Sequence, residues 1–145
     1  RREEFSASRG KGAELNGERI RVSTRNSLKD ALIGNTSHVN DSQNYTFENI
    51  STFRALYKHS LTIRRSGCSA LDLAYVAAGR LDGFWANGLG VWDIAAGMLI
   101  AEEAGALTSN FLGDPDYKKG DHYLCATPKC FKHMLEAIKP NFTAH

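Results

Sequence analysis

The sequence contains no long hydrophobic run. A membrane-spanning helix needs about 18 or more consecutive apolar residues, whereas the longest apolar stretches, 70–78 and 94–101, each contain a polar residue or a glycine. The opening residues, Arg-Arg-Glu-Glu-Phe, also lack the apolar core and small-residue cleavage site of a signal peptide. We therefore expect neither a membrane span nor a signal peptide, and we expect the chain to begin in the middle of a longer protein.

The sequence also has little net charge and few cysteines. A net charge of +2 over 145 residues is too small to indicate nucleic-acid binding. The mild basic excess of the first thirty residues, eight Lys or Arg against five Asp or Glu, is typical of a solvated face. Cys68, Cys125 and Cys130 cannot all pair and form no CxxC motif. This cysteine pattern predicts a reducing compartment, most simply the cytoplasm.

Several motifs of common enzymes and metal sites are missing. There is no Walker loop, Rossmann glycine fingerprint or Gly-x-Ser-x-Gly nucleophile elbow. Segment 122–133 does contain four potential zinc ligands: His122, Cys125, Cys130 and His133. Their spacing lacks the paired pattern of a structural zinc site, and residues three apart on a strand point to opposite faces. We interpret Cys125 as a small buried hydrophobic residue.

The sequence does contain alternating strand and helix signals. Asn16-Gly17 predicts a hairpin, because a type I′ turn needs positive φ at both central positions. Helical spacing of apolar residues predicts helices at Tyr45–Tyr57, Ser69–Ala78, Trp92–Ala104 and Lys129–Ile138. Apolar runs predict strands at 20–22, 31–33, 61–63, 81–85, 106–111 and 123–126, while 34–44 reads as a polar loop. This alternation favours a layered α/β fold with a mixed β-sheet flanked by helices.

Two predicted helix starts carry the candidate chemistry. A carboxylate in the first helical turn, such as Asp93, caps free N–H groups and is stabilised by the helix dipole. The same carboxylate suits Mg²⁺, which takes few protein oxygens and keeps several waters. At the other start, Gly67-Cys68-Ser69, free N–H groups can hold a phosphate or a sugar hydroxyl. From these residues alone, structural roles are favoured: Asp93 as a cap, Gly67 as a turn residue and Ser69 as a cap.

Three segments together resemble the inositol monophosphatase family. The family's C-terminal motif, Trp-Asp-x-Ala-Ala-Gly, is matched by residues 92–97. Residues 64–84, which begin Arg-Arg-Ser-Gly-Cys-Ser-Ala-Leu-Asp, resemble the bacterial members, especially the SuhB group. Residues 5–17 are similar to the hairpin that follows the family's metal motif.

The resemblance implies an architecture. The family fold is a layered α-β-α-β-α sandwich, and its members are usually homodimers. On this pattern, residues 1–145 form the C-terminal portion of the fold. Residues 1–30 are expected to be a strand hairpin from the first sheet, and residues 31–145 the C-terminal α/β domain. The N-terminal metal-binding half is expected to be absent from this chain.

The resemblance also implies Mg²⁺-dependent hydrolysis of a phosphate monoester, either inositol 1-phosphate or a related sugar or polyol phosphate. Asp93 would ligate Mg²⁺ and contact a substrate hydroxyl. Gly67, Cys68 and Ser69 would contact the inositol or the phosphate. Trp92 would pack behind Asp93.

The chain departs from the family pattern at Ala86. The family commonly has a Glu at this position, seven residues before the motif Asp, where it binds inositol hydroxyls, and Val91 replaces a Pro that is common in bacterial members. Losing the Glu removes a charged hydrogen bond to a ligand. Ala86 therefore marks a substrate-binding position at which this chain departs from the family, and a related phosphate becomes an alternative to inositol 1-phosphate.

A second function is implied by the SuhB group, whose members also act as partners of the transcription elongation machinery. That role, in antitermination and ribosomal RNA synthesis, does not require catalysis, and the substitution at Ala86 slightly favours it. The family's other metal ligands, an N-terminal Glu and an Asp-Pro-x-Asp-Gly-Thr motif, do not occur here. We therefore predict that this chain alone has no phosphatase activity.

Overall fold

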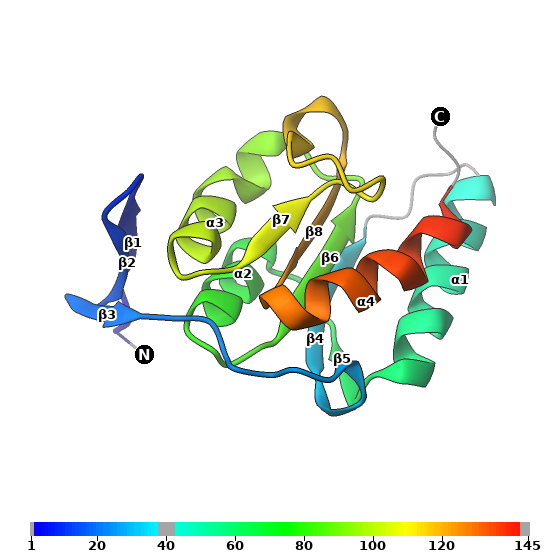
Figure 1. Cartoon of the computed structure of the whole chain (residues 1–145). Helices are drawn as coiled ribbons and strands as arrows, with labels where there is room; N and C mark the ends of the chain where they lie inside the picture. Colours follow the sequence, from blue (N-terminus) through cyan, green and yellow to red (C-terminus); the bar gives the residue numbers. More distant parts are fainter. Residues whose placement is uncertain (1, 38–42, 143–145) are drawn as a thin grey trace.

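The computed structural model describes residues 2–37 and 43–142, so residues 38–42 of the predicted polar loop lie outside the described residues. It contains a three-stranded sheet and a five-stranded sheet (Figure 1). The small sheet consists of β1 (Phe5–Ser8), β2 (Gly12–Leu15) and β3 (Glu18–Ile20). The larger sheet consists of β4 (Leu32–Ser37), β5 (Thr62–Arg64), β6 (Gly83–Asn87), β7 (Leu107–Ser109) and β8 (His122–Ala126).

The small sheet is an antiparallel meander that packs on a helix. Its second turn places Asn16 at φ 52° and Gly17 at φ 82°, between the paired residues Leu15 and Glu18. The predicted hairpin is therefore confirmed, since both central residues have the positive φ of a type I′ turn. The first turn is tied to the rest of the fold, because the Glu103 carboxylate accepts hydrogen bonds from Gly10 N–H (2.5 Å) and Gly12 N–H (3.0 Å).

The larger sheet is mixed, as the sequence predicts. Its strand order is β5-β4-β6-β8-β7. Strand β4 is parallel to both β5 and β6, whereas β8 is antiparallel to β6 and β7. Because β4 and β6 are parallel, their carboxyl ends meet at one edge of the sheet, the edge where open α/β sheets bind ligands.

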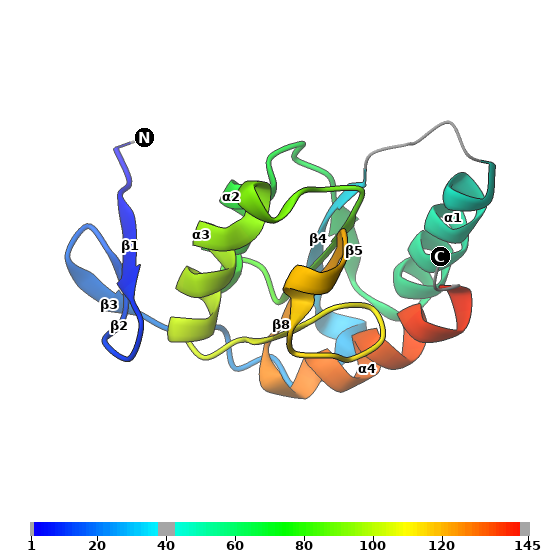
Figure 2. The same ribbon diagram turned by 90° about the horizontal axis from the view of Figure 1, so that it is seen from above.

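Helices cover both faces of the larger sheet (Figure 2). One face carries α2 (Ser69–Ala77) and α3 (Val91–Glu103), and the other carries α1 (Gln43–His59) and α4 (Pro128–Ile138). Alternation along β6 shows both cores, since Phe84 and Ala86 pack with the α2/α3 cluster and Trp85 packs with the α1/α4 cluster. The small sheet lies beyond α3, so the α/β layered fold class is confirmed.

The predicted elements are present, but some of their boundaries differ. Strand β6 begins two residues later than predicted because Asp82 has another role. Its carboxylate accepts hydrogen bonds from Leu32 N–H (2.8 Å) and Ser23 Oγ, and it pairs with Arg25 (3.4 Å). Strand β7 ends early because Asn110 Oδ1 accepts hydrogen bonds from two backbone N–H groups of the following turn. In both cases a polar side chain at the strand end accepts hydrogen bonds from backbone N–H groups elsewhere in the fold, in β4 for Asp82 and in the following turn for Asn110.

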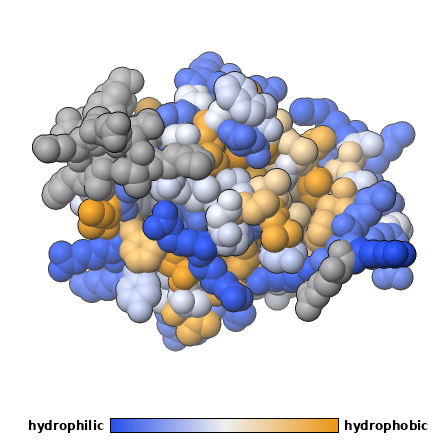
Figure 3. Space-filling model, turned by 180° about the vertical axis from the view of Figure 1, so that it is seen from behind, coloured by the Kyte–Doolittle hydropathy of each residue, from blue (hydrophilic) through white to orange (hydrophobic). Residues whose placement is uncertain are grey.

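Within the described ranges, no helix combines the length and the apolar character needed to cross a bilayer. Apolar and polar residues alternate over the face shown in Figure 3. Large side chains that remain exposed include Ile50, Tyr57 and Leu61 near α1, and Trp92 at the start of α3.

Candidate functional site

The start of α2 is built on a glycine. Gly67 has φ 81°, a left-handed conformation that side chains other than glycine rarely adopt. Cys68 is the residue at the N-cap, and no side chain caps the helix there, so the prediction that Ser69 is the cap is wrong. Ser69 instead lies inside the first turn and is buried. The first N–H groups of α2 therefore point out of the helix without intrahelical acceptors.

The start of α3 places Asp93 in the first turn. Its Oδ2 accepts a hydrogen bond from Gly90 N–H at 3.1 Å, and the Asp93 N–H donates to Gly90 O at 3.0 Å. The predicted capping role of Asp93 is thus confirmed. A carboxylate has two oxygens, however, and Asp93 remains exposed to solvent. Capping and metal ligation are therefore compatible on this side chain.

The two helix starts face one hollow of about 250 Å³, here called the helix-start hollow. The residues that line it are Thr36, Gly67, Cys68, Ser69, Ala70, Leu89 and Asp93. Four of the predicted site residues, Gly67, Cys68, Ser69 and Asp93, come together in this one place. The hollow combines a carboxylate with the positive end of a helix dipole, an arrangement suited to a hydroxyl or an anion together with a cation.

Ala86 lies near the hollow without lining it. It is fully buried on β6, between Thr36 of β4 and Tyr123 of β8. Thr36, its register partner, does line the hollow. The sequence did not predict Thr36 as a site residue because residues 34–44 read as a polar loop. Its position at the carboxyl end of a parallel strand is the signal that could have identified it.

The expectation that Trp92 packs behind Asp93 is wrong. Trp92 is 81% exposed. Its ring lies directly over Gly90, where a Cβ atom would come within 2.3 Å of it. The side chain thus lies over the loop before α3 and faces outward, because the inward positions of this turn are taken by Ile94 and Gly97.

The residues present fit part of a magnesium site. Among residues 2–37 and 43–142, there is no group of three or more His, Cys, Asp or Glu side chains that could hold a metal ion. Mg²⁺ is commonly bound by one or two carboxylates together with phosphate oxygens and waters. Asp93 can therefore supply one protein ligand, and the described residues do not supply a complete set.

The four candidate zinc ligands lie apart. Cys125 belongs to the α2/α3 core and Cys130 to the α1/α4 core, so the interpretation of Cys125 as a buried hydrophobic residue is confirmed. Burial raises the pKa of both thiols. His122 Nδ1 accepts a hydrogen bond from Phe111 N–H at 2.9 Å, and burial lowers the pKa of His122 while nearby Asp121 acts in the opposite direction.

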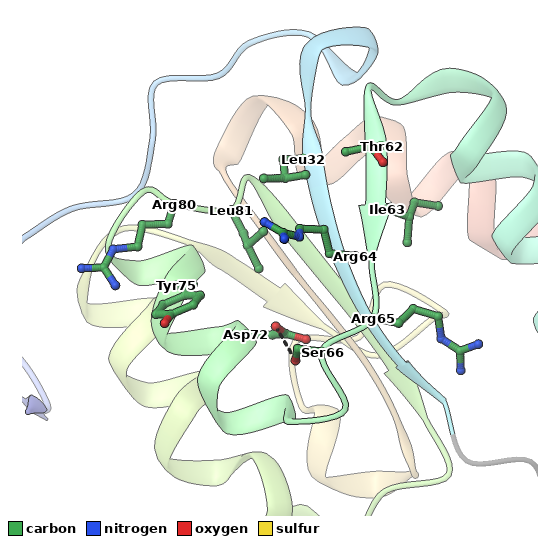
Figure 4. A pocket seen from close by; sticks show the side chains of 10 residues that line it. All are labelled: Leu32, Thr62, Ile63, Arg64, Arg65, Ser66, Asp72, Tyr75, Arg80 and Leu81. Carbon is green, nitrogen blue, oxygen red and sulfur yellow. Dashed lines mark hydrogen bonds between the residues drawn. The ribbon is translucent and has the colours of Figure 1, made fainter. Parts of the chain in front are cut away.

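A larger hollow of about 690 Å³ lies between β5, the following turn and α2 (Figure 4). We call it the arginine-lined hollow; its charged residues are Arg64, Arg65, Asp72 and Arg80. Burial raises the pKa of the Asp72 carboxyl, while a hydrogen bond from Ser66 and the charge of Arg64 oppose that shift. No predicted site residue lines this hollow.

Ser66 connects the two hollows. Its hydroxyl donates to Asp72 Oδ1 at 2.9 Å in the arginine-lined hollow. The same oxygen accepts the Cys68 N–H at 3.1 Å, next to the helix-start hollow. The turn before α2 is therefore held in place from the side of the larger hollow.

The layers and the paired helix starts define a class, that of layered α/β proteins with a mixed sheet between two pairs of helices. The family model described as "Inositol monophosphatase family" matches residues 1–141, and the chain belongs to this family. The Nus factor SuhB of Pseudomonas aeruginosa is 49% identical over 97% of this chain and 52% of its own length. The Nus factor SuhB of Escherichia coli is 43% identical over 96% of this chain and 52% of its own length.

Solved structures show the same fold. The extragenic suppressor protein SuhB from Bartonella henselae matches with a TM-score of 0.88 and 36% identity, covering 97% of this chain and 53% of that chain. The inositol monophosphatase from Anabaena matches with a TM-score of 0.86 and 31% identity, covering 95% of this chain and 54% of that chain. The chain thus spans about half the length of the relatives it matches.

Proposed function

We propose that this chain forms part of a Mg²⁺-dependent phosphomonoesterase that acts on inositol 1-phosphate or a related sugar or polyol phosphate. The observation that carries the proposal is the meeting of Asp93 and the uncapped start of α2 in one hollow. Membership of the inositol monophosphatase family supports the same reaction class. Both the substrate and the metal are part of the proposal.

In the proposed site, Asp93 would hold Mg²⁺, because its carboxylate lines the hollow and remains exposed there. A bound Mg²⁺ would polarise the phosphate and lower the pKa of a bound water. The chain's own contribution is to place the ligand. The first N–H groups of α2 and the buried Ser69 would orient a hydroxyl or a phosphate oxygen, and Gly67 and Cys68 would shape the wall next to them.

We also propose that the rest of the site comes from a further layer of the family fold, in line with a first sheet of which residues 1–30 form a part. Helix α3 supports this, because its residues 94–101 are all apolar or glycine, and helices that are apolar on every side are usually buried on all sides. Its outer face exposes Trp92, Ala95 and Ala96. Strand β1 is at one edge of the small sheet, where a further strand could pair.

The test is phosphate release from myo-inositol 1-phosphate by the protein at its natural length. We expect turnover in Mg²⁺ and none in EDTA, and none from residues 1–145 alone in either condition. Turnover that persists in EDTA would contradict a Mg²⁺-dependent reaction. Turnover by residues 1–145 alone would show that the described residues hold a complete site.

A second candidate function is binding to the transcription elongation machinery, in antitermination and ribosomal RNA synthesis. Two points favour it: similarity to proteins named Nus factor SuhB, and the buried methyl group of Ala86 at the position where, on the family pattern, a Glu is common. Co-purification with elongation complexes, in a variant that lacks phosphatase activity, would support this role. Loss of co-purification together with activity would argue against a role independent of catalysis.

We further propose a homodimer in the cytoplasm. The homodimer rests on the family resemblance, and the location on three cysteines that form no disulfide in the described residues. Sedimentation equilibrium of the protein at its natural length tests the first proposal. A mass of one protomer across the accessible concentration range would contradict it.

A further inference from the structure

Thr36 carries a buried hydroxyl that has no hydrogen-bond partner among the described residues. It lies near the carboxyl end of β4 and is 8% exposed. Leu32 of the same strand packs with the α2/α3 core and Ile33 with the α1/α4 core, so alternation turns Thr36 toward α2 and α3. Thr36 lines the helix-start hollow, and its Oγ1 has no hydrogen-bond partner in the described part of the chain.

The neighbours of Thr36 on the sheet do not provide that partner. Ala86 lies beside it across the β4–β6 pair and has only a methyl group. Tyr123 follows on β8, and its hydroxyl is already placed between two carbonyl oxygens, Leu89 O at 3.0 Å and Gly120 O at 3.1 Å. Of the three neighbouring residues Thr36, Ala86 and Tyr123, Thr36 is therefore the one whose polar side chain makes no hydrogen bond within the described residues.

A leftover buried hydroxyl is unfavourable for folding. Most buried polar groups in native proteins are hydrogen-bonded, and the exceptions concentrate where a ligand, an ion or a water completes the site. Here the exception borders the same hollow as the uncapped start of α2 and the Asp93 carboxylate. Two independent unmet hydrogen-bonding groups thus face one space.

We infer that Thr36 is a ligand-binding residue of the helix-start hollow, whose hydroxyl donates a hydrogen bond to an oxygen of the bound phosphate ester. This inference rests on the proposed function and adds a selectivity residue to it. Neither Thr36 nor Ala86, its neighbour on β6, carries a negative charge. A ligand oxygen can therefore approach the Thr36 hydroxyl, whereas a carboxylate at either position would repel it. The acceptor is an oxygen either of the phosphate or of the alcohol part.

The test compares Thr36→Val, which removes the hydroxyl at nearly constant shape, with Thr36→Ser, which keeps it. Calorimetry on the protein at its natural length, in Mg²⁺, uses two probes that are not consumed: inorganic phosphate and myo-inositol. Thr36→Val should weaken binding of one probe by about tenfold, the upper range for a neutral hydrogen bond, and Thr36→Ser should stay within about twofold. The probe that is weakened identifies which part of the ester Thr36 contacts.

Thermal unfolding separates this role from a structural one. A hydroxyl without a partner in the free protein should be dispensable, so Thr36→Val should unfold at the wild-type temperature or above it. In turnover of myo-inositol 1-phosphate, Thr36→Val should raise KM and leave kcat unchanged. A lowered unfolding temperature with both probe affinities unchanged would overturn the inference.

Failure of the inference and failure of the proposed function give different results. If the wild type binds the probes and Thr36→Val binds them equally well, Thr36 is not a ligand-binding residue and the proposed function stands. If the wild type binds neither probe and does not hydrolyse the ester, the proposed function fails and the inference fails with it.

Discussion

The helix-start hollow and the arginine-lined hollow differ in size and in how well their polar groups are matched by hydrogen-bond partners. The arginine-lined hollow is the larger, at about 690 Å³ against about 250 Å³. Yet Arg80 there is already bound to Glu3 at 2.6 and 2.9 Å, and it lies over the ring of Tyr75. The helix-start hollow instead contains an uncapped helix start and the hydroxyl of Thr36, which has no partner in residues 2–37 and 43–142.

Asp72 of the arginine-lined hollow can be compared directly with Thr36, because its Oδ2 is also buried without a hydrogen-bond partner in the described residues. That oxygen packs against Gly34, because a Cβ atom added to this glycine would lie only 3.3 Å from Asp72 Oδ2. Burial raises the pKa of Asp72, and its other oxygen accepts a hydrogen bond from the Ser66 hydroxyl at 2.9 Å. The Thr36 hydroxyl, by contrast, has no hydrogen-bond partner among the described residues. A polar side chain left without any partner beside a helix start is thus a better guide to a site than volume.

The largest expected effect is on turnover, when the carboxylate of the helix-start hollow is changed and the carboxylate of the arginine-lined hollow serves as its control. Asp93→Asn should reduce turnover of myo-inositol 1-phosphate by about 1,000-fold, because a lost charged metal ligand removes several kcal/mol of transition-state stabilisation. Asp72→Asn, the matched change in the arginine-lined hollow, should leave turnover within about threefold. Steady-state kinetics on the protein at its natural length measures both. Equal losses would remove the functional distinction between the hollows.

The next effect concerns the packing that sets the helix-start hollow. Gly97 lies against α2, and a Cβ atom there would come within 2.7 Å of Leu73 Cβ. Gly97→Val should therefore lower the free energy of unfolding by about 1–3 kcal/mol, the usual cost of overpacking. Urea unfolding measures the change.

The control is Lys132→Ala on the exposed side of α4, which should stay within about 0.5 kcal/mol. If Gly97→Val unfolds at the same urea concentration as the wild type, the contact between α2 and α3 is looser than the structure shows. The spacing of the two helix starts would then not depend on the close contact between Gly97 and Leu73.

Thiol labelling tests whether phosphate occupies the helix-start hollow. Cys68 is exposed and lines the helix-start hollow, whereas Cys125 and Cys130 are buried and have raised pKa values. We expect Cys68 to react first in the folded protein. Inorganic phosphate with Mg²⁺, at about ten times its dissociation constant, should slow this labelling about tenfold. An unchanged rate under saturating phosphate would place the phosphate in a different part of the protein.

The smallest effect is the pH dependence that Asp72 contributes. Its folded-state pKa lies above the ordinary value of 3.8, so the folded protein binds more protons than the unfolded chain in that range. Stability is therefore present below the unfolded pKa and falls as pH rises through the folded pKa. Relative to Asp72→Asn, the wild type should lose free energy of unfolding between about pH 4 and the raised pKa. Urea unfolding over this range measures it, and a parallel pH dependence of the two proteins would contradict it.

Turns and helix starts could be predicted from the sequence, because each depends on a few neighbouring residues. The Asn16-Gly17 turn needs two residues that tolerate positive φ, the turn before α2 follows from Gly67, and the start of α3 follows from the capping carboxylate of Asp93. The prediction failed for Trp92, because exposure depends on what covers a helix face and not on the motif around it. It also passed over Thr36, whose strand looked like a loop from its polar composition.

The sequence by itself determined that Gly67 turns the chain before α2 and that Asp93 lies in the first turn of α3, because turn formation and capping involve residues a few positions apart. Only the tertiary structure decided that both helix starts face one hollow. It also decided that Thr36, rather than Ala86, borders that hollow. The reason is that the parallel pairing of β4 with β6 joins residues far apart in the chain, and its register sets which polar atoms are left without partners.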